Sequence, residues 1–181
     1  VHTPNAERVA SEGALFGRYF CAAPQCSPSR AATFTGRHPH AVGVLGLTDA
    51  AFGWTLNAGE IHMAEHLRQL GYETALFGLA PEAAGGGCDE SLLDPVGYDF
   101  RKHQLAYPAG QAPRDLAAWL ETRDHPAHPF LAQIGVFETY RWREGRYRGF
   151  DSVEPDDSLG VTISGYLNDT PGTREDFAEL Q

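Results

Sequence analysis

The chain has 181 residues, of which 42% are hydrophobic and 21% are charged, an ordinary balance for one domain with a real core. Its formal net charge of −10 argues against a general nucleic-acid-binding protein, because such a protein needs a basic face. The sequence shows no apolar run long enough to cross a bilayer and no N-terminal signal peptide, so we expect no membrane span.

Helix and strand signals follow each other along the first part of the chain. Thr3 can cap a helix with Pro4 in its first turn, and the apolar pattern predicts that this helix ends near Gly13. Residues 18–22 then predict a short strand, in which we expect Cys21 to be buried, as free cysteines usually are. This strand would lead directly into a turn that contains a cysteine, and a loop rich in glycine and histidine follows that turn.

The rest of the chain alternates helices with strands. Apolar residues at helical spacing predict a helix over residues 58–70, and short apolar runs predict strands at residues 74–77 and 130–137. Residues 81–110 are rich in glycine, proline and aspartate and predict a loop, after which Pro113 opens a further helix. This alternation favours an α/β fold with a mostly parallel sheet that helices cover on both faces.

The stretch that most clearly indicates chemistry is a short run that we call the cysteine motif. Its members are Cys26, Ser27, Pro28, Ser29 and Arg30. Ser27 is a good N-cap and Pro28 suits the first helical position, so the motif predicts the start of a helix that Gly36 can end. Unpaired N–H groups at such a start favour an anion, and Arg30 adds a planar donor for sulfate, phosphate or carboxylate oxygens. The structural alternative is a buried cysteine beside an ordinary helix cap.

The cysteine motif, followed by Thr35-Gly36-Arg37, resembles the signature of the type I sulfatases of the alkaline-phosphatase-like superfamily. Flanking segments keep the order of that family, at residues 2–16, 43–47, 65–78 and 129–137. Residues 166–176 are especially similar to the sulfamidase (N-sulfoglucosamine sulfohydrolase) branch. The resemblance implies a three-layer α/β sandwich with a mostly parallel central sheet. We expect residues 1–181 to be an N-terminal part of the sulfatase catalytic domain, truncated at both ends.

The resemblance also implies an activity, the hydrolysis of a sulfate ester or sulfamate on a sugar or an aryl group. In that family the formylglycine-generating enzyme converts the cysteine, here Cys26, to formylglycine, whose hydrated aldehyde attacks the sulfur. Ser27, Pro28, Ser29 and Arg30 would form the recognition core for the modifying enzyme. Arg30 would also hold the hydrated aldehyde and the sulfate. The family resemblance further suggests a periplasmic or secreted protein.

Type I sulfatases need a divalent metal, usually calcium, which carboxylate and amide oxygens hold. Position 26, as formylglycine in place of Cys26, is the ligand that the resemblance assigns in this chain. The other ligands of the family correspond to positions outside it. Asp156 and Asp157 do not match the metal strand of the family, and we interpret them as part of a solvated loop.

Two departures from the family pattern bear on catalysis. Residues 79–81 (Leu-Ala-Pro) stand where the family has Lys-x-His, and Tyr140 stands where it has a further histidine. His38, Tyr140 and Arg141 are candidate substrate-binding replacements, although the arginine cluster at residues 141–148 also fits a solvated loop. These departures keep open a second function, a catalytically impaired sulfatase relative that binds sulfated glycans without turnover.

A rival pattern lies in the helix predicted for residues 58–70. His62, Glu65 and His66 match the spacing of inverted zinc peptidases, in which two histidines bind zinc and the glutamate acts on a water. Because the apolar residues of that helix lie on another face, both histidines can equally be surface residues. A zinc peptidase is therefore a third interpretation of the sequence.

Overall fold

The computed structural model describes residues 3–48, 53–82, 96–102, 110–136, 140, 158 and 160–179. The chain divides into two compact units, which we describe separately. The larger unit is Phe20–Phe137, and it contains the sheet and the cysteine motif. The smaller unit combines Val1–Tyr19 with Glu138–Gln181.

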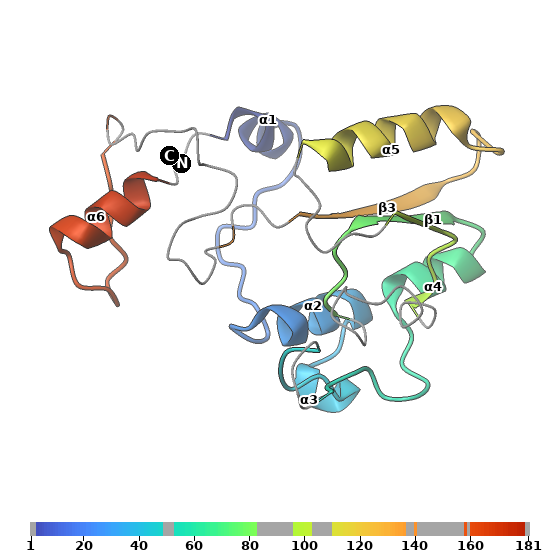
Figure 1. Cartoon of the computed structure of the whole chain (residues 1–181), viewed down its shortest axis with the longest axis horizontal. Helices are drawn as coiled ribbons and strands as arrows, with labels where there is room; N and C mark the ends of the chain where they lie inside the picture. The colour runs from blue at the N-terminus through green and yellow to red at the C-terminus, as the bar shows by residue number, and fades with distance from the viewer. Residues whose placement is uncertain are drawn as a thin grey trace. The chain divides into compact units, whose positions relative to one another are not determined.

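Three parallel strands form the sheet of the larger unit (Figure 1). They are β1 (Glu73–Gly78), β2 (Phe100–Lys102) and β3 (Phe130–Gly135), in the order β2-β1-β3. β1 pairs with β3 along its whole length, from Glu73 opposite Phe130 to Gly78 opposite Gly135. The strands predicted at residues 74–77 and 130–137 and their parallel pairing are therefore confirmed. β2 lies in the segment predicted as a loop, because three residues are too few to show a strand pattern.

Helices cover both faces of this sheet (Figure 1), with α4 (Met63–Gln69) on one side and α5 (Gln111–Thr122) on the other. Successive side chains of a strand point to opposite faces, so β1 serves two hydrophobic cores. Leu76 packs in one cluster with Ala64 of α4, whereas Phe77 packs in the other with Ala112 of α5. The predicted three-layer α/β arrangement is confirmed, and the prediction of a helix opening near Pro113 is also correct.

The cysteine motif opens α2 (Cys26–Thr35), which α3 (Pro39–Val42) follows closely. These two helices form a third small core around the buried residues Ala31, Val42 and Val44. Gly36 ends α2 in the left-handed region at φ 67°, and its N–H donates to the carbonyl of Ala32 at 2.9 Å. The predicted stop of this helix is therefore confirmed.

Two further predicted elements differ from the structure. Residues 18–22 form no strand, and Cys21 is exposed rather than buried, as is the neighbouring Phe20 with 85% of its surface accessible. The strand prediction for residues 18–22 is therefore wrong. It rested on apolar residues alone, and no described strand pairs with this segment. The helix predicted for residues 58–70 begins only at Met63, because His62 caps it, and Ile61 stays outside the helix and exposed.

The smaller unit contributes α1 (Pro4–Glu12) and α6 (Pro171–Ala178). α1 begins after Thr3 and ends before Gly13, as predicted. Thr170 caps α6 by accepting a 3.2 Å hydrogen bond from the N–H of Thr173. Across the described helices of both units, none is long and apolar enough to cross a membrane.

Candidate active site

Cys26 is the first residue of α2, with Gln25 in the N-cap position. The sequence predicted Ser27 as the N-cap and Pro28 as the first helical residue. The helix therefore begins two residues earlier than predicted, at Cys26. The Ser27 hydroxyl instead accepts a 3.4 Å hydrogen bond from the N–H of Thr48, and Pro28 is buried in the first turn, where its missing N–H costs no helical bond. Cys26 is exposed, with its sulfur 3.8 Å from the Ser27 oxygen.

Arg30 lies one turn after Cys26 on the same helix, and two partners hold its guanidinium. Its Nε–H donates a 2.7 Å hydrogen bond to Oε2 of Glu82, and its central carbon lies 5.4 Å from the centre of the Phe34 ring. The side chain is 30% exposed, but its Nη2 is buried and has no hydrogen-bond partner among the described residues. Arg30 therefore keeps donors available for a further acceptor.

Glu82 is the buried centre of a polar network that no motif in the sequence indicates. Its Oε1 accepts a 2.9 Å hydrogen bond from Nε2 of Gln133 in β3, and the hydroxyl of Tyr98 donates to the amide oxygen of that glutamine. Burial alone would raise the pKa of the Glu82 carboxyl, but His62, Arg30 and Gln133 outweigh it and lower the pKa to about 2. Glu82 is thus an ionised carboxylate with no exposed side-chain surface.

The pKa of Tyr98 shifts in the opposite direction from that of Glu82. Burial raises the pKa of its hydroxyl well above the usual value, and the negative charge of Glu82 adds to this effect. Tyr98 therefore acts in this network as a neutral hydrogen-bond donor.

His62 closes the network on the side of α4. Its Nδ1 accepts a 3.1 Å hydrogen bond from the N–H of Ala64, which places the ring proton on Nε2. Nε2 lies 3.7 Å from Oε1 of Glu82, beyond hydrogen-bond length, and the ring stacks on Phe34 at 4.9 Å. The interpretation of both histidines as surface residues is wrong for His62, which is buried, and correct for His66, which is exposed.

The segment that leaves β1 lies against the cysteine motif. Besides the contact of Arg30 with Glu82, the hydroxyl of Thr48 donates a 2.9 Å hydrogen bond to the carbonyl of Pro81, while the N–H of Thr48 contacts Ser27. This segment includes residues 79–81, which replace the Lys-x-His of the family pattern. The residues that replace the family pattern therefore lie next to the cysteine motif.

The remaining predicted site residues are not brought to the motif by the described contacts. His38 occupies the N-cap position of α3 without a side-chain capping hydrogen bond, and its exposed ring stacks on His40 at 5.6 Å. Tyr140 is 55% exposed and belongs to the smaller unit. Arg141 and the pair at residues 156–157 lie outside the described residues. Ser29 is half-buried, and its carbonyl accepts a hydrogen bond from the Thr33 hydroxyl.

The described residues do not fit a metal ion. Calcium takes six to eight oxygen ligands, yet both oxygens of the carboxylate nearest the motif, Glu82, are already engaged by Arg30 and Gln133. Within the described ranges, no group of three or more histidine, cysteine, aspartate or glutamate side chains could hold a metal. A calcium ion beside position 26 would need ligands from other residues.

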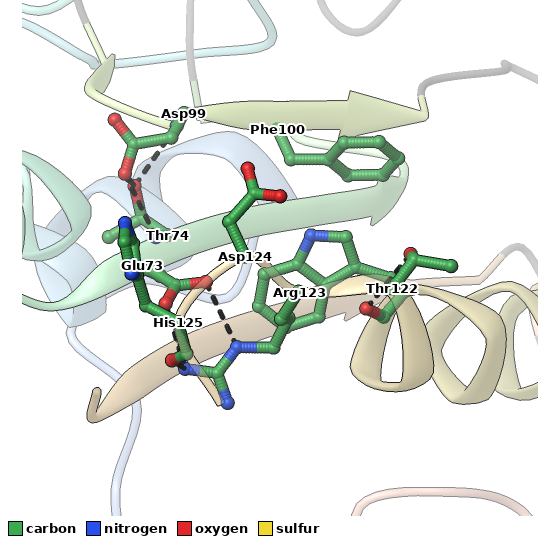
Figure 2. A pocket seen from close by; sticks show the side chains of 9 residues that line it. Glu73, Thr74, Asp99, Phe100, Thr122, Arg123, Asp124 and His125 are labelled. Atoms are coloured by element: carbon green, nitrogen blue, oxygen red, sulfur yellow. Dashed lines mark hydrogen bonds and ion pairs between the residues drawn. The ribbon is translucent and has the colours of Figure 1, made fainter. Parts of the chain in front are cut away.

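A separate hollow of about 430 Å³ lies at the amino ends of the strands (Figure 2). Glu73, Asp99 and Arg123 are among its lining residues, and Arg123 donates to Glu73 at 2.9 Å while Asp99 accepts from Thr74. Glu73 opens β1 and Glu82 follows its end, so about 16 Å of strand separates this hollow from the Glu82 network. In open α/β sheets ligands gather at the carboxyl ends, which is where the motif lies.

The fold and the site together define an α/β sandwich of the alkaline-phosphatase-like type, with an exposed cysteine and an arginine beyond the carboxyl ends of its parallel strands. The sequence model of the Sulfatase family matches residues 1–108, and the chain belongs to that family. The expected relationship to the type I sulfatases is thereby confirmed.

Named relatives agree with this assignment. An arylsulfatase of Hemicentrotus pulcherrimus is 35% identical over 161 residues, which cover 85% of this chain and 28% of that protein. Arylsulfatase H of Homo sapiens is 40% identical over 85 residues, which cover 43% of this chain and 15% of that protein. The chain thus spans a small part of the length of these relatives.

A solved structure of a protein in complex with its substrate D-glucosamine-2-N,6-O-disulfate resembles this fold. The superposition has a TM-score of 0.56 at 25% sequence identity, and it covers 74% of this chain and 28% of that chain. The likeness therefore extends over most of the present sequence but only a part of the neighbour.

Proposed function

We propose that residues 1–181 belong to the catalytic domain of a sulfatase whose whole chain hydrolyses a sulfate ester or sulfamate. The place of Cys26 carries this proposal. The residue is exposed in the first turn of α2, and Arg30 lies one turn along the same helix. Membership of the sulfatase family supports the assignment of this pair to the reacting centre.

The nucleophile in this proposal is formylglycine made from Cys26 by a formylglycine-generating enzyme. Formylglycine would supply a hydrated aldehyde as the nucleophile toward sulfur. Ser27 and Pro28 are buried in the folded chain, so the modifying enzyme must act on the motif before the fold closes. The exposure of Cys26 leaves position 26 open to substrate afterwards.

The surroundings of position 26 suit an oxyanion. The first N–H groups of α2 have no helical acceptors, and the helix dipole is positive at this end. Arg30 adds donors that its bond to Glu82 leaves available. Together these groups would bind and orient sulfate oxygens while position 26 reacts.

The substrate class that we propose is a sulfated carbohydrate or an aryl sulfate. The solved neighbour binds a glucosamine with N- and O-sulfate groups, and relatives are named arylsulfatases. His38, Tyr140 and Arg141 remain candidate contacts to the organic part of the substrate. We further propose calcium as the metal of the whole protein, with position 26 as a ligand.

A second function is favoured by a specific observation. Residues 79–81 lack the cation and the acid of the family pattern, and the carboxylate of Glu82 lies beside Arg30 instead. Such a site suits a relative that binds sulfated glycans without turnover. Hydrolysis of p-nitrophenyl sulfate and of N-sulfoglucosamine by the whole protein with calcium would identify the sulfatase, and binding without product would identify the second function.

Mass spectrometry of the tryptic peptide of residues 19–30 tests the nucleophile. This peptide contains both Cys21 and Cys26, so Cys21 serves as an internal control. In protein produced with the formylglycine-generating enzyme, we expect an aldehyde at position 26 and an alkylatable thiol at position 21. An unmodified thiol at position 26 in an active preparation would overturn the mechanism.

A further inference from the structure

Glu82 links the motif helix to the sheet, and it directly follows residues 79–81, which depart from the sulfatase pattern. We propose that Glu82 is the positioning residue of Arg30 and holds its guanidinium beside position 26. This role rests on the proposed function in so far as it serves the reaction. The hydrogen bond itself can be tested without turnover.

The guanidinium is restrained from two directions. Glu82 accepts the Nε–H at 2.7 Å, and the ring of Phe34, four residues along the same helix, lies 5.4 Å from the guanidinium carbon. An arginine without such partners loses considerable rotamer entropy when a ligand fixes it. Arg30 is therefore ordered before any anion binds.

Glu82 is itself fixed by the sheet. Gln133 of β3 donates to its second oxygen at 2.9 Å, and Tyr98 in turn donates to Gln133. The preceding residue, Pro81, is held by the hydroxyl of Thr48. The carboxylate of Glu82 therefore connects Arg30 of the motif to the hydrogen-bonded residues of the sheet.

The geometry leaves the anion-binding donors of Arg30 in place. Only its Nε contacts Glu82 among the described interactions, and Nη2 is buried without an acceptor within the described part of the chain. A guanidinium can offer two parallel donors to the oxygens of sulfate. Glu82 thus restrains the guanidinium through Nε and leaves Nη2 without an acceptor among the described residues.

Two variants distinguish a positioning role from a purely electrostatic role, because the two roles give opposite results for Glu82→Leu. Glu82→Gln removes the negative charge but keeps an oxygen acceptor of the same shape, whereas Glu82→Leu removes both. If Glu82 positions Arg30, sulfate binding is retained or strengthened in Glu82→Gln and weakened in Glu82→Leu. If Glu82 acts only by its charge, both variants bind sulfate more tightly.

The hydrogen bond is tested by NMR of the 15N-labelled chain, in which Arg30→Lys identifies the Nε–H signal of Arg30. We expect solvent exchange of this Nε–H to be at least about tenfold faster in Glu82→Leu than in the wild type, and a smaller increase in Glu82→Gln. Glu73→Leu is the matched control, because Glu73 pairs with a different arginine, Arg123. Unchanged exchange in Glu82→Leu, or in Glu82→Gln if the leucine variant does not fold, overturns the proposal.

Calorimetric titration with inorganic sulfate then separates this proposal from the proposed function. We expect affinity about tenfold weaker in Glu82→Leu and unchanged or higher in Glu82→Gln. Equal tightening in both variants overturns the positioning role. Absence of sulfate binding in the wild type, together with the expected exchange rates, would reject the sulfatase site while leaving the positioning of Arg30 established.

Discussion

The Nε–H of Arg30 donates a 2.7 Å hydrogen bond to the carboxylate of Glu82, which lies 52 residues further along the chain. Glu82 is fully buried, whereas Arg30 stays 30% exposed. A buried carboxylate needs charged or hydrogen-bonding partners, and Glu82 has both, from α2 and from β3. The motif helix and the sheet are therefore coupled through this one side chain.

Removal of the Glu82 carboxylate should destabilise the chain, because it leaves the donors of Arg30 and Gln133 without their acceptor. We expect Glu82→Leu to lower the free energy of unfolding by about 3 kcal/mol, because removal of one member of a buried ion pair leaves the charge of the other member uncompensated. Arg30 is partly exposed, so the loss should fall at the lower end of the range for such pairs. Urea denaturation followed by circular dichroism measures it.

The double variant Arg30→Met/Glu82→Leu is the control for this prediction. Replacing both members by apolar residues removes the stranded charge, so the double variant should be more stable than Glu82→Leu alone. The single variant Arg30→Met completes the cycle, and a loss in the double variant equal to the sum of the two single losses would show that Arg30 and Glu82 do not interact energetically.

Acid should weaken this coupling. The pKa of Glu82 is about 2 in the folded chain, against an ordinary value of 4.5. A folded-state pKa below the unfolded value stabilises the fold above about pH 4.5, and this contribution is lost as the pH falls from there toward 2.

The difference in unfolding free energy between the wild type and Glu82→Gln isolates this effect. Glu65 and Glu73 also have lowered pKa values beside Arg68 and Arg123, and their contributions cancel in the comparison. We expect the advantage of the wild type to shrink by up to about 3 kcal/mol between pH 5 and the acid limit. A difference that stays constant over this range would contradict an ionised Glu82.

Gly135 should tolerate no side chain. A Cβ at this position would lie 2.1 Å from the carbonyl oxygen of Leu79, whose N–H donates to the carbonyl of Gly135 at 2.9 Å. Backbone cannot move aside cheaply, so Gly135→Ala should cost at least about 3 kcal/mol in thermal or urea unfolding. Gly36→Ala is the control: its site is open but has a φ of 67°, and we expect a loss of about 1 kcal/mol.

Much of the fold could be predicted because its signals are local. The alternation of helices and strands indicated the parallel sheet, and Gly36 marked the end of the motif helix. Residues 18–22 misled the prediction because an apolar run has no strand partner among the described residues. β2 was missed because pairing with β1, rather than a pattern of its own, defines it.

The site was predicted only in part because its contacts join distant segments. The cysteine motif is contiguous and could be found, whereas Glu82 meets Arg30 across 52 residues. Gln133 did carry a signal, as the one polar residue in the strand Phe130–Gly135. His62 was assigned to a helix interior, and nothing in its spacing shows that it caps α4 and lies buried against Phe34.

Cys26→Ala should separate stability from function. The side chain is exposed at the first position of α2, and its hydrogen bonding within the described part of the chain is a weak 3.8 Å contact with the Ser27 hydroxyl. We therefore expect the free energy of unfolding to change by less than about 0.5 kcal/mol. Turnover of an aryl sulfate by the whole protein should be lost, because alanine cannot become formylglycine. Cys21→Ala, at an exposed cysteine outside the motif, should leave both quantities unchanged, and retained turnover in Cys26→Ala would exclude position 26 as the nucleophile.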